Sequence, residues 1–143
     1  MNTHKNRQEW IDALRSERYM QGRIHLKYYE DGGDEVYPIY CPWGVACEIY
    51  HGYNPKTTEW SEPDPYEEDV KLYDTGRCHF WIERYNNDLD CTEKLGCIGF
   101  PIEEILDFFG SNNDEMSEII DMNDWQDKTF EEIAEYIEKG KTE

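Results

Sequence analysis

Cysteine and histidine are the residues in this chain whose types and spacing are best suited to chemistry. Cys41 and Cys47 are separated by five residues, as are Cys91 and Cys97, and His51 lies four residues after Cys47. These five side chains could together bind zinc or serve a thiol-dependent enzyme. Structural zinc sites usually place about two to four residues between neighbouring cysteines, and no pair of cysteines here does so. We therefore expect these thiols to act as small buried hydrophobic groups, and we keep the metal or thiol enzyme as an alternative.

The rest of the chain contains no recognised catalytic or nucleotide-binding motif. No G-x-S-x-G, Walker or G-x-G-x-x-G sequence occurs. Residues 86–90 read Asn-x-Asp-x-Asp, as a calcium loop begins, but Cys91 and Cys97 stand where that loop needs Gly and Glu. Asn123 and Asp124 form either a polar site or a left-handed turn between two helices, which both residue types favour. We assign no catalytic residue and expect no cofactor.

Acidic charge is the strongest signal in the composition. The 143 residues include 33 Asp and Glu against 14 Lys and Arg, a formal net charge of −19. Residues 1–60 hold 9 acidic and 7 basic side chains, whereas residues 61–143 hold 24 acidic and 7 basic side chains. A nucleic-acid-binding protein needs a basic surface, and so does a protein that binds anionic lipid. The charge therefore excludes direct binding of nucleic acid or of an anionic membrane, and it is concentrated in the second part of the chain.

Nine carboxylates lie off the apolar stripes of the helices expected after residue 100, and they form the candidate interaction surface. They are Glu103, Glu104, Asp107, Glu115, Glu118, Asp121, Glu131, Glu135 and Glu138. Like charges four residues apart on a helix cost about 0.2–0.5 kcal/mol per pair. A surface selected for stability alone would carry some lysines there. The surface either steers a basic partner or is an ordinary solvated face that promotes solubility.

Aromatic residues make up 15% of the chain, too many for an acidic disordered tail. Several lie in or beside loops and short strands, where they serve either an interface or the core: Trp43, Tyr53, Trp60, Tyr66, Tyr73, Trp81 and Tyr85. No run of 18 apolar residues occurs, and the first 25 residues contain no apolar signal region. We expect a folded, soluble protein of the cytoplasm with reduced thiols.

The periodicity of apolar residues predicts one α+β domain over residues 1–143. Its parts would be an N-terminal helix, two short antiparallel hairpins, a central short helix and a C-terminal segment of three helices. Helices are expected at 7–17, 42–51, 101–109, 113–122 and 129–140, and strands at 23–29, 36–41, 70–73 and 79–85. Pro38 suggests an edge strand, Gly52 a helix end, and residues 53–65 and 86–92 loops. Thr129 and Glu132 form a capping box, S/T-x-x-E, at the start of the last helix.

Three blocks of sequence carry a family resemblance. Residues 10–16 read WIDALRS, residues 40–48 read YCPWGVACE, and the C-terminal third contains MND at 122–124 followed by TFEEIAEYIE at 129–138. These blocks resemble a widespread group of small uncharacterised proteins of tailed bacteriophages, which similarly carry W-x2-AL-R-S, a Cys-rich G-V-x-C helix and L-N-D…F-x-E-I-A. The group usually has two adjacent cysteines before its Gly-Val segment, whereas here only Cys41 is kept. Relative to the group, residues 53–95 look like a divergent or inserted region.

The resemblance implies a phage protein that acts in the cytoplasm of the infected bacterial host, and it supplies no catalytic residue. Together with the charge, it predicts a small acidic accessory protein that binds a basic host or phage protein without catalysis, in host takeover or anti-defence. The alternatives are a nucleic-acid mimic that blocks a basic nucleic-acid-binding protein, and a thiol- or metal-dependent enzyme.

Overall fold

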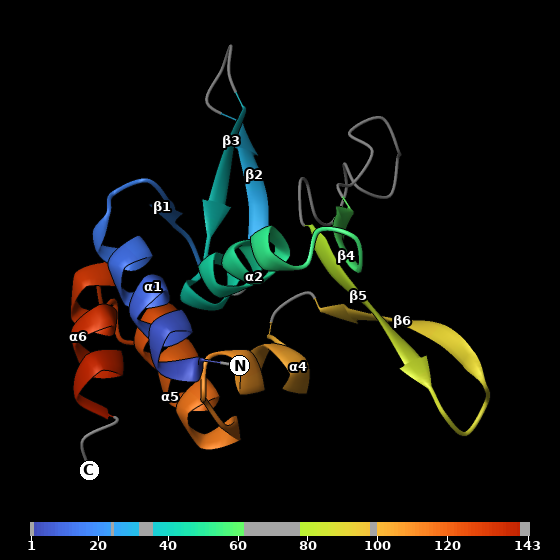
Figure 1. The fold of residues 1–143 in the computed structure, drawn as a ribbon. Coiled ribbons are helices and arrows are strands. Elements are labelled where there is room, and N and C mark those ends of the chain that lie inside the picture. Colours follow the sequence, from blue (N-terminus) through green and yellow to red (C-terminus); the bar gives the residue numbers. More distant parts are fainter. Residues whose placement is uncertain (1, 24, 32–35, 62–77, 98–99, 141–143) are drawn as a thin grey trace.

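The computed structural model describes residues 2–23, 25–31, 36–61, 78–97 and 100–140, which are drawn in colour in Figure 1. The elements are α1 (Thr3–Arg15), β1 (Met20–Gln21), β2 (Lys27–Asp31), β3 (Val36–Tyr40), α2 (Pro42–Tyr53), β4 (Thr58–Ser61), β5 (His79–Asn86), β6 (Cys91–Cys97), α4 (Glu103–Phe108), α5 (Asn113–Asp124) and α6 (Phe130–Gly140). The helices and the two small sheets confirm the predicted α+β class.

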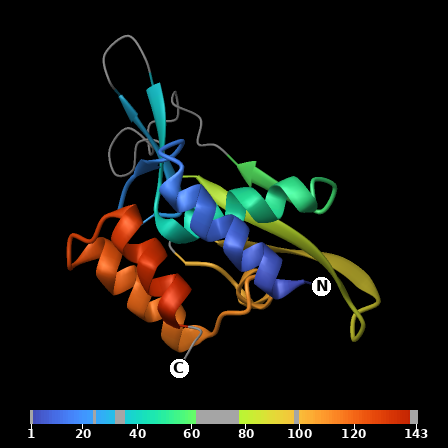
Figure 2. The ribbon, with the colours of Figure 1, turned by 60° about the vertical axis from the view of Figure 1, so that its left-hand side comes forward.

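Helix α1 begins at Thr3, earlier than predicted, because Asn2 caps it. The Asn2 side chain accepts a hydrogen bond from the Lys5 backbone N–H at 3.0 Å. An oxygen at this position satisfies one of the amide donors that a helix start leaves without a partner. Trp10 and Leu14 form the buried stripe, as predicted. Helix α1 packs against α6, across more than a hundred residues of sequence (Figure 2).

The first sheet has the strand order β1-β3-β2. The predicted hairpin is confirmed by the antiparallel pairing of β2 with β3, while its turn, residues 32–35, lies outside the described residues. The short parallel strand β1 was not predicted. Pro38 predicted an edge strand, but β3 lies between β1 and β2. β1 pairs only with Ile39 and Tyr40, so β3 is central at those two residues and Pro38 lies beyond the reach of β1.

Helix α2 packs closely against the segment that precedes β2. A Cβ atom added to Gly44 would lie 1.7 Å from the backbone oxygen of Leu26, so only glycine fits this approach. Cys41 caps the helix: its Sγ accepts a hydrogen bond from the Gly44 N–H at 3.4 Å. The expected end at Gly52 is wrong, because α2 continues to Tyr53 with Asn54 as its C-terminal cap.

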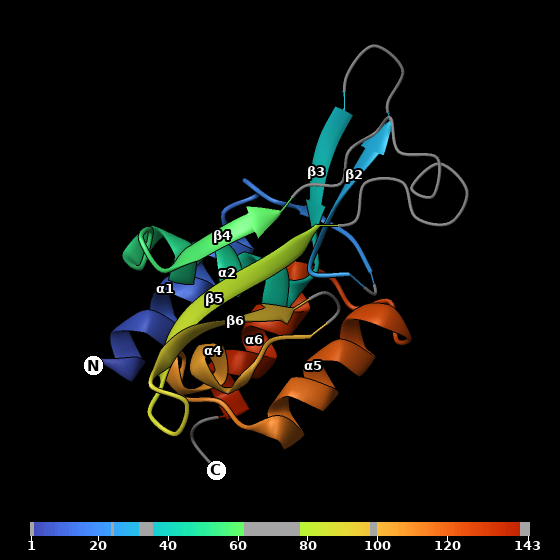
Figure 3. The same ribbon diagram turned by 90° about the vertical axis from the view of Figure 1, so that its right-hand side faces the viewer.

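The second sheet has the strand order β4-β5-β6 and is wholly antiparallel (Figure 3). β5 confirms the strand expected at 79–85, whereas the strand expected at 70–73 lies outside the described residues. The expected loops are wrong in part: β4 lies within 53–65, and β6 begins within 86–92. The calcium-like segment is the turn between β5 and β6, where the Asn86 Oδ1 atom accepts hydrogen bonds from the backbone of Asp88 and Leu89. It is therefore an Asx turn.

The three C-terminal helices confirm the predicted segment. Asn112 caps α5 through the Glu115 N–H, and α5 continues to Asp124, two residues beyond the predicted end. The left-handed turn expected at Asn123–Asp124 is wrong, since both residues lie in α5 and the positive φ of 54° belongs to Asp127. The capping box is confirmed in both directions, because Thr129 Oγ1 accepts from the Glu132 N–H while Glu132 Oε1 accepts from the Thr129 N–H.

Aromatic side chains join the helices to the second sheet in one core. The ring of Trp10 lies 4.5 Å from that of Trp43 and 5.3 Å from that of Phe109, centroid to centroid, and all three are fully buried. Phe80 brings β5 into the same cluster. Among the described residues, no helix is long and apolar enough to span a membrane.

Candidate interaction surface

The nine predicted carboxylates do not share one environment. Seven of them are exposed: Glu103, Asp107, Glu118, Asp121, Glu131, Glu135 and Glu138. The side chains of Glu104 and Glu115 are only 26% and 14% exposed. The charge that each carboxylate presents therefore depends on the cations that the fold brings to it.

Glu115 belongs to an internal ion pair. The guanidinium of Arg7, 3% exposed, donates to Glu115 Oε1 at 2.8 Å and to Oε2 at 2.5 Å. The same group donates to the backbone oxygens of Phe109 and Ile137 at 3.2 and 3.1 Å. Arg7 thus links α1 to the end of α4, to the first turn of α5 and to α6. We assign Glu115 to the internal framework and leave it out of the candidate surface.

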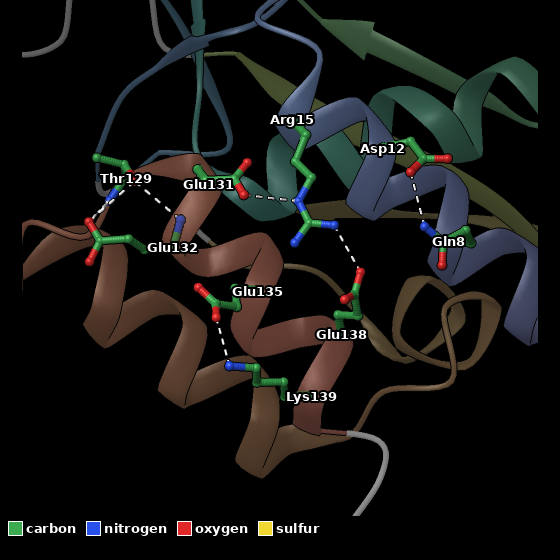
Figure 4. Close-up of polar contacts among 9 residues, drawn as sticks. All are labelled: Gln8, Asp12, Arg15, Thr129, Glu131, Glu132, Glu135, Glu138 and Lys139. Carbon is green, nitrogen blue, oxygen red and sulfur yellow. Dashed lines mark hydrogen bonds and ion pairs between the residues drawn. The ribbon is translucent and has the colours of Figure 1, made fainter.

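Arg15 neutralises part of the outer side of α6. Its Nε atom donates to Glu131 Oε1 at 3.2 Å, and its Nη1 atom donates to Glu138 Oε2 at 2.8 Å (Figure 4). The hydrogen bond that Arg15 donates to Glu138 is the main cause that raises the pKa of Arg15 above its ordinary value. On the same helix, Lys139 pairs with Glu135 at 2.6 Å. Each of the three predicted carboxylates of α6 is thus paired with a cation, with Glu131 and Glu138 sharing Arg15.

Glu104 on α4 is compensated from the second sheet. Arg84 of β5 donates to Glu104 Oε1 at 2.7 Å and to Glu93 Oε1 at 2.9 Å, so this pair ties the sheet to α4. Glu103 and Asp107, on the other sides of α4, form no ion pair with a described residue.

The outer side of α5 differs from α6, because it carries exposed carboxylates and no cation among the described residues. We define the α5 face as Asp114, Glu118, Asp121 and Trp125. At 100° per residue, these four positions fall within roughly 60° of one another on one side of α5, over about 16 Å along its axis. Glu118 accepts a hydrogen bond from the hydroxyl of Tyr136, and burial together with this bond raises the Tyr136 pKa to about 12. Trp125 closes the α5 face with a side chain that is 75% exposed.

Asn123 holds α5 in place from the opposite, buried side. Its side-chain nitrogen donates to the Gly22 oxygen at 2.7 Å, and its oxygen accepts from Gln21 Nε2 at 2.7 Å. Gln21 in turn accepts from the Phe130 N–H at the start of α6. Asn123 is therefore a structural link between α5 and the segment around β1.

The cysteines are mostly buried thiols. Cys41, Cys47 and Cys97 lie in the core, as expected, but Cys91 is exposed at the start of β6. Burial raises the pKa of Cys41 to about 12 and that of Cys97 to about 11. The thiolate is the form that attacks substrates and binds metals, so these two groups are inert near neutral pH. Within the part of the chain that the structure describes, no three His, Cys, Asp or Glu side chains are grouped so that they could hold a metal ion.

His51 stabilises the end of α2. Thr58 Oγ1 donates to the Asn54 oxygen at 2.6 Å, and His51 Nδ1 lies 2.7 Å from the same Oγ1. Since the only hydroxyl proton is used on Asn54, Nδ1 is the donor to Thr58. His51 also borders a shallow hollow of about 360 Å³ beside Trp81 and the Lys94–Glu59 ion pair. Among the described residues that line this hollow there is no cysteine that His51 could activate.

Sequence reasoning missed Arg7, Arg15 and Trp125. The two arginines flank the apolar stripe of the first predicted helix, which was a usable signal for contact with the acidic segment. Trp125 follows Asp121 by four residues, which places it on the same side of the helix. Of the aromatic residues placed near loops, Trp43 is core and Tyr53 and Tyr85 are exposed, while 66 and 73 lie outside the described residues.

A family model described as a domain of unknown function (DUF8296) matches residues 1–141. The match covers nearly the whole chain. No curated protein and no solved structure matches the chain.

Proposed function

The chain belongs to the DUF8296 family, and we propose that it is a small non-catalytic binding module that holds a basic protein against the acidic side of its C-terminal helices. The single observation that carries the proposal is the uncompensated negative charge of the α5 face, next to an α6 whose carboxylates are paired. The resemblance to phage proteins suggests the setting, in which the module acts on a host or phage protein in the cytoplasm of an infected bacterium.

A protein partner fits this surface better than other classes of ligand. Nucleic acid and anionic lipid carry the same sign of charge as the surface and are repelled by it. A basic protein is attracted, and clustered charge of one sign raises its rate of association at low salt. Burial of Cys41 and Cys97 as neutral thiols also weakens the thiol-enzyme alternative.

A nucleic-acid mimic is the narrower form of the same proposal. Duplex DNA presents one charge per about 1.7 Å of its axis. Asp114 and Asp121 are seven helical steps apart, or roughly 10 Å along the helix axis, and with Glu118 they supply three charges where a duplex supplies about six. The α5 face alone therefore has about half the charge density of a duplex, and the geometry supports a basic partner in general more than a copy of DNA.

Capture from bacterial lysate tests the proposed function. The full chain, immobilised, is expected to retain a stoichiometric protein whose pI exceeds about 9 and to release it as salt rises from about 50 to 200 mM. A chain with the same fold, such as the Gly52→Ala variant, should retain the same protein and serves as the control for immobilisation. Recovery of no stoichiometric partner at either salt concentration contradicts the proposal.

A further inference from the structure

Trp125 stands out among the tryptophans of this protein. Trp10 and Trp43 are fully buried, and Trp60 and Trp81 are partly buried, whereas Trp125 is 75% exposed. Its backbone is fixed, because the Trp125 N–H closes the last turn of α5 by donating to the Asp121 oxygen at 3.0 Å. Folding alone gains little from an indole placed there. Large exposed aromatic side chains held on rigid elements are typical of binding hot spots.

The charges beside Trp125 are available to a partner. Asp114, Glu118 and Asp121 form no ion pair with a described residue, and two described cations beside the segment that follows α5 are already paired. Arg23 pairs with Asp127, and Lys128 pairs with Glu132 at 3.6 Å. No described helix or strand covers α5 at the edge of the molecule in Figure 3. The α5 face is thus a helix side that pairs a row of carboxylates with one aromatic ring.

Resting on the proposed function, we propose that the α5 face is the docking centre for the basic partner and that it receives an arginine-containing segment. A guanidinium can stack on the indole of Trp125 while its N–H groups, or those of a neighbouring arginine, donate to Asp121 and Glu118. Arginine suits this site better than lysine, because its flat, weakly hydrated cation stacks on aromatic rings and binds carboxylates with two hydrogen bonds. Because its charge is complementary to that of the α5 face, such a segment binds there more tightly than an apolar peptide.

Two peptides test the choice of arginine. Octa-arginine and octalysine, titrated into the full chain in about 150 mM salt, carry equal charge and differ in the ability to stack. We expect octa-arginine to bind several-fold more tightly and to shield Trp125 from iodide quenching. Trp125→Ala should weaken octa-arginine about tenfold and remove the difference between the peptides. Tyr85→Ala, which removes another exposed aromatic ring on the β5–β6 hairpin, is the matched control and should change neither affinity.

A pair of charge variants tests the location. Glu118→Gln with Asp121→Asn removes the same net charge as Glu103→Gln with Asp107→Asn on α4, and all four residues are exposed. We expect the α5 variant to weaken octa-arginine by roughly three- to tenfold, in line with two exposed ion pairs, and the α4 variant by less than about twofold. Circular dichroism should show that both variants keep the wild-type fold.

Three results would overturn the inference. Equal affinity for both peptides with no effect of Trp125→Ala removes the stacking role, and equal losses in the α4 and α5 variants remove the location. In both cases the proposed function survives if the chain still captures a basic protein. If sedimentation shows a dimer of the chain alone that Trp125→Ala dissociates, the occupant of the α5 face is a second copy and not a basic segment.

Discussion

Replacing Arg7 with methionine is expected to lower the free energy of unfolding by about 3 kcal/mol or more. Arg7 is 3% exposed and donates to both oxygens of Glu115 and to the backbone oxygens of Phe109 and Ile137. Removing one partner of a buried ion pair costs about 3–5 kcal/mol, because the other charge stays buried without compensation. Glu115 keeps 14% exposure, which places the effect toward the lower end of this range. Methionine fills most of the volume, so the loss reports the polar contacts.

Arg15→Met is the matched control, because it removes the same charge from the same helix. Arg15 is 30% exposed and its two glutamates are 65% and 50% exposed, so the loss should stay near about 1 kcal/mol. Urea unfolding followed by tryptophan fluorescence measures both values. At roughly 3 °C per kcal/mol for a chain of this length, Arg7→Met should lower Tm by about 10 °C.

A double variant separates the buried charge from simple loss of packing. Arg7→Met with Glu115→Met removes both ions, and replacing a whole buried pair by apolar groups is close to neutral. We therefore expect the double variant to be more stable than Arg7→Met alone. A loss for Arg7→Met no larger than that for Arg15→Met, or a double variant less stable than the single one, would refute the account of the Arg7 network.

Three other outcomes follow from backbone and thiol environments. Gly44→Ala should lower the free energy of unfolding by about 3 kcal/mol or more, because its Cβ would lie 1.7 Å from a backbone oxygen. Gly52→Ala on the same helix meets no atom and should raise the free energy of unfolding by about 0.5–1 kcal/mol. Urea unfolding measures both values. A thiol reagent should label Cys91 rapidly in the native protein and all five cysteines in denaturant. If the native Cys91→Ser variant still has a fast-reacting thiol, the core thiols are accessible and this expectation is wrong. The folded pKa values of Cys41 and Cys97, about 12 and 11, lie above the ordinary 9.0, so folding holds these protons more tightly than the unfolded chain does. The contribution of these two thiols to the free energy of unfolding is fully present below pH 9 and is lost as pH rises toward 11–12. A urea midpoint that rises over this interval would contradict their burial.

The helices could be predicted from the sequence because their signals are local. The capping box at Thr129 and the buried stripe of Trp10 and Leu14 each depend on residues within a few positions of one another. The strands of the second sheet could not be predicted as well, because β4 is only four residues long and its partner β5 begins 18 residues after β4 ends. The pairing of β1 with β3 could not be predicted for the same reason, because β1 comes from residues 20–21, outside any local window around β3.

The exposure of most of the predicted carboxylates could be predicted from the sequence, whereas their ion pairing could not. The acidic segment contains Lys128 as its only cation between residues 101 and 138, and this favours a uniformly negative face. Folding brings Arg7, Arg15 and Arg84 to that segment from elsewhere in the chain, which compensates α6 and part of α4. The α5 face keeps its charge because none of these arginines reaches it among the described contacts.

The salt dependence of partner binding tests the central claim most directly. The dissociation constant of the captured partner is to be measured from about 50 to 200 mM salt for the wild-type chain and for the Glu118→Gln, Asp121→Asn variant. We predict that affinity falls steeply with salt for the wild type and that the variant shows both a weaker affinity and a shallower slope. An affinity that does not change with salt, or a variant with the wild-type affinity and slope, would contradict the claim that a basic partner docks on the carboxylates of α5.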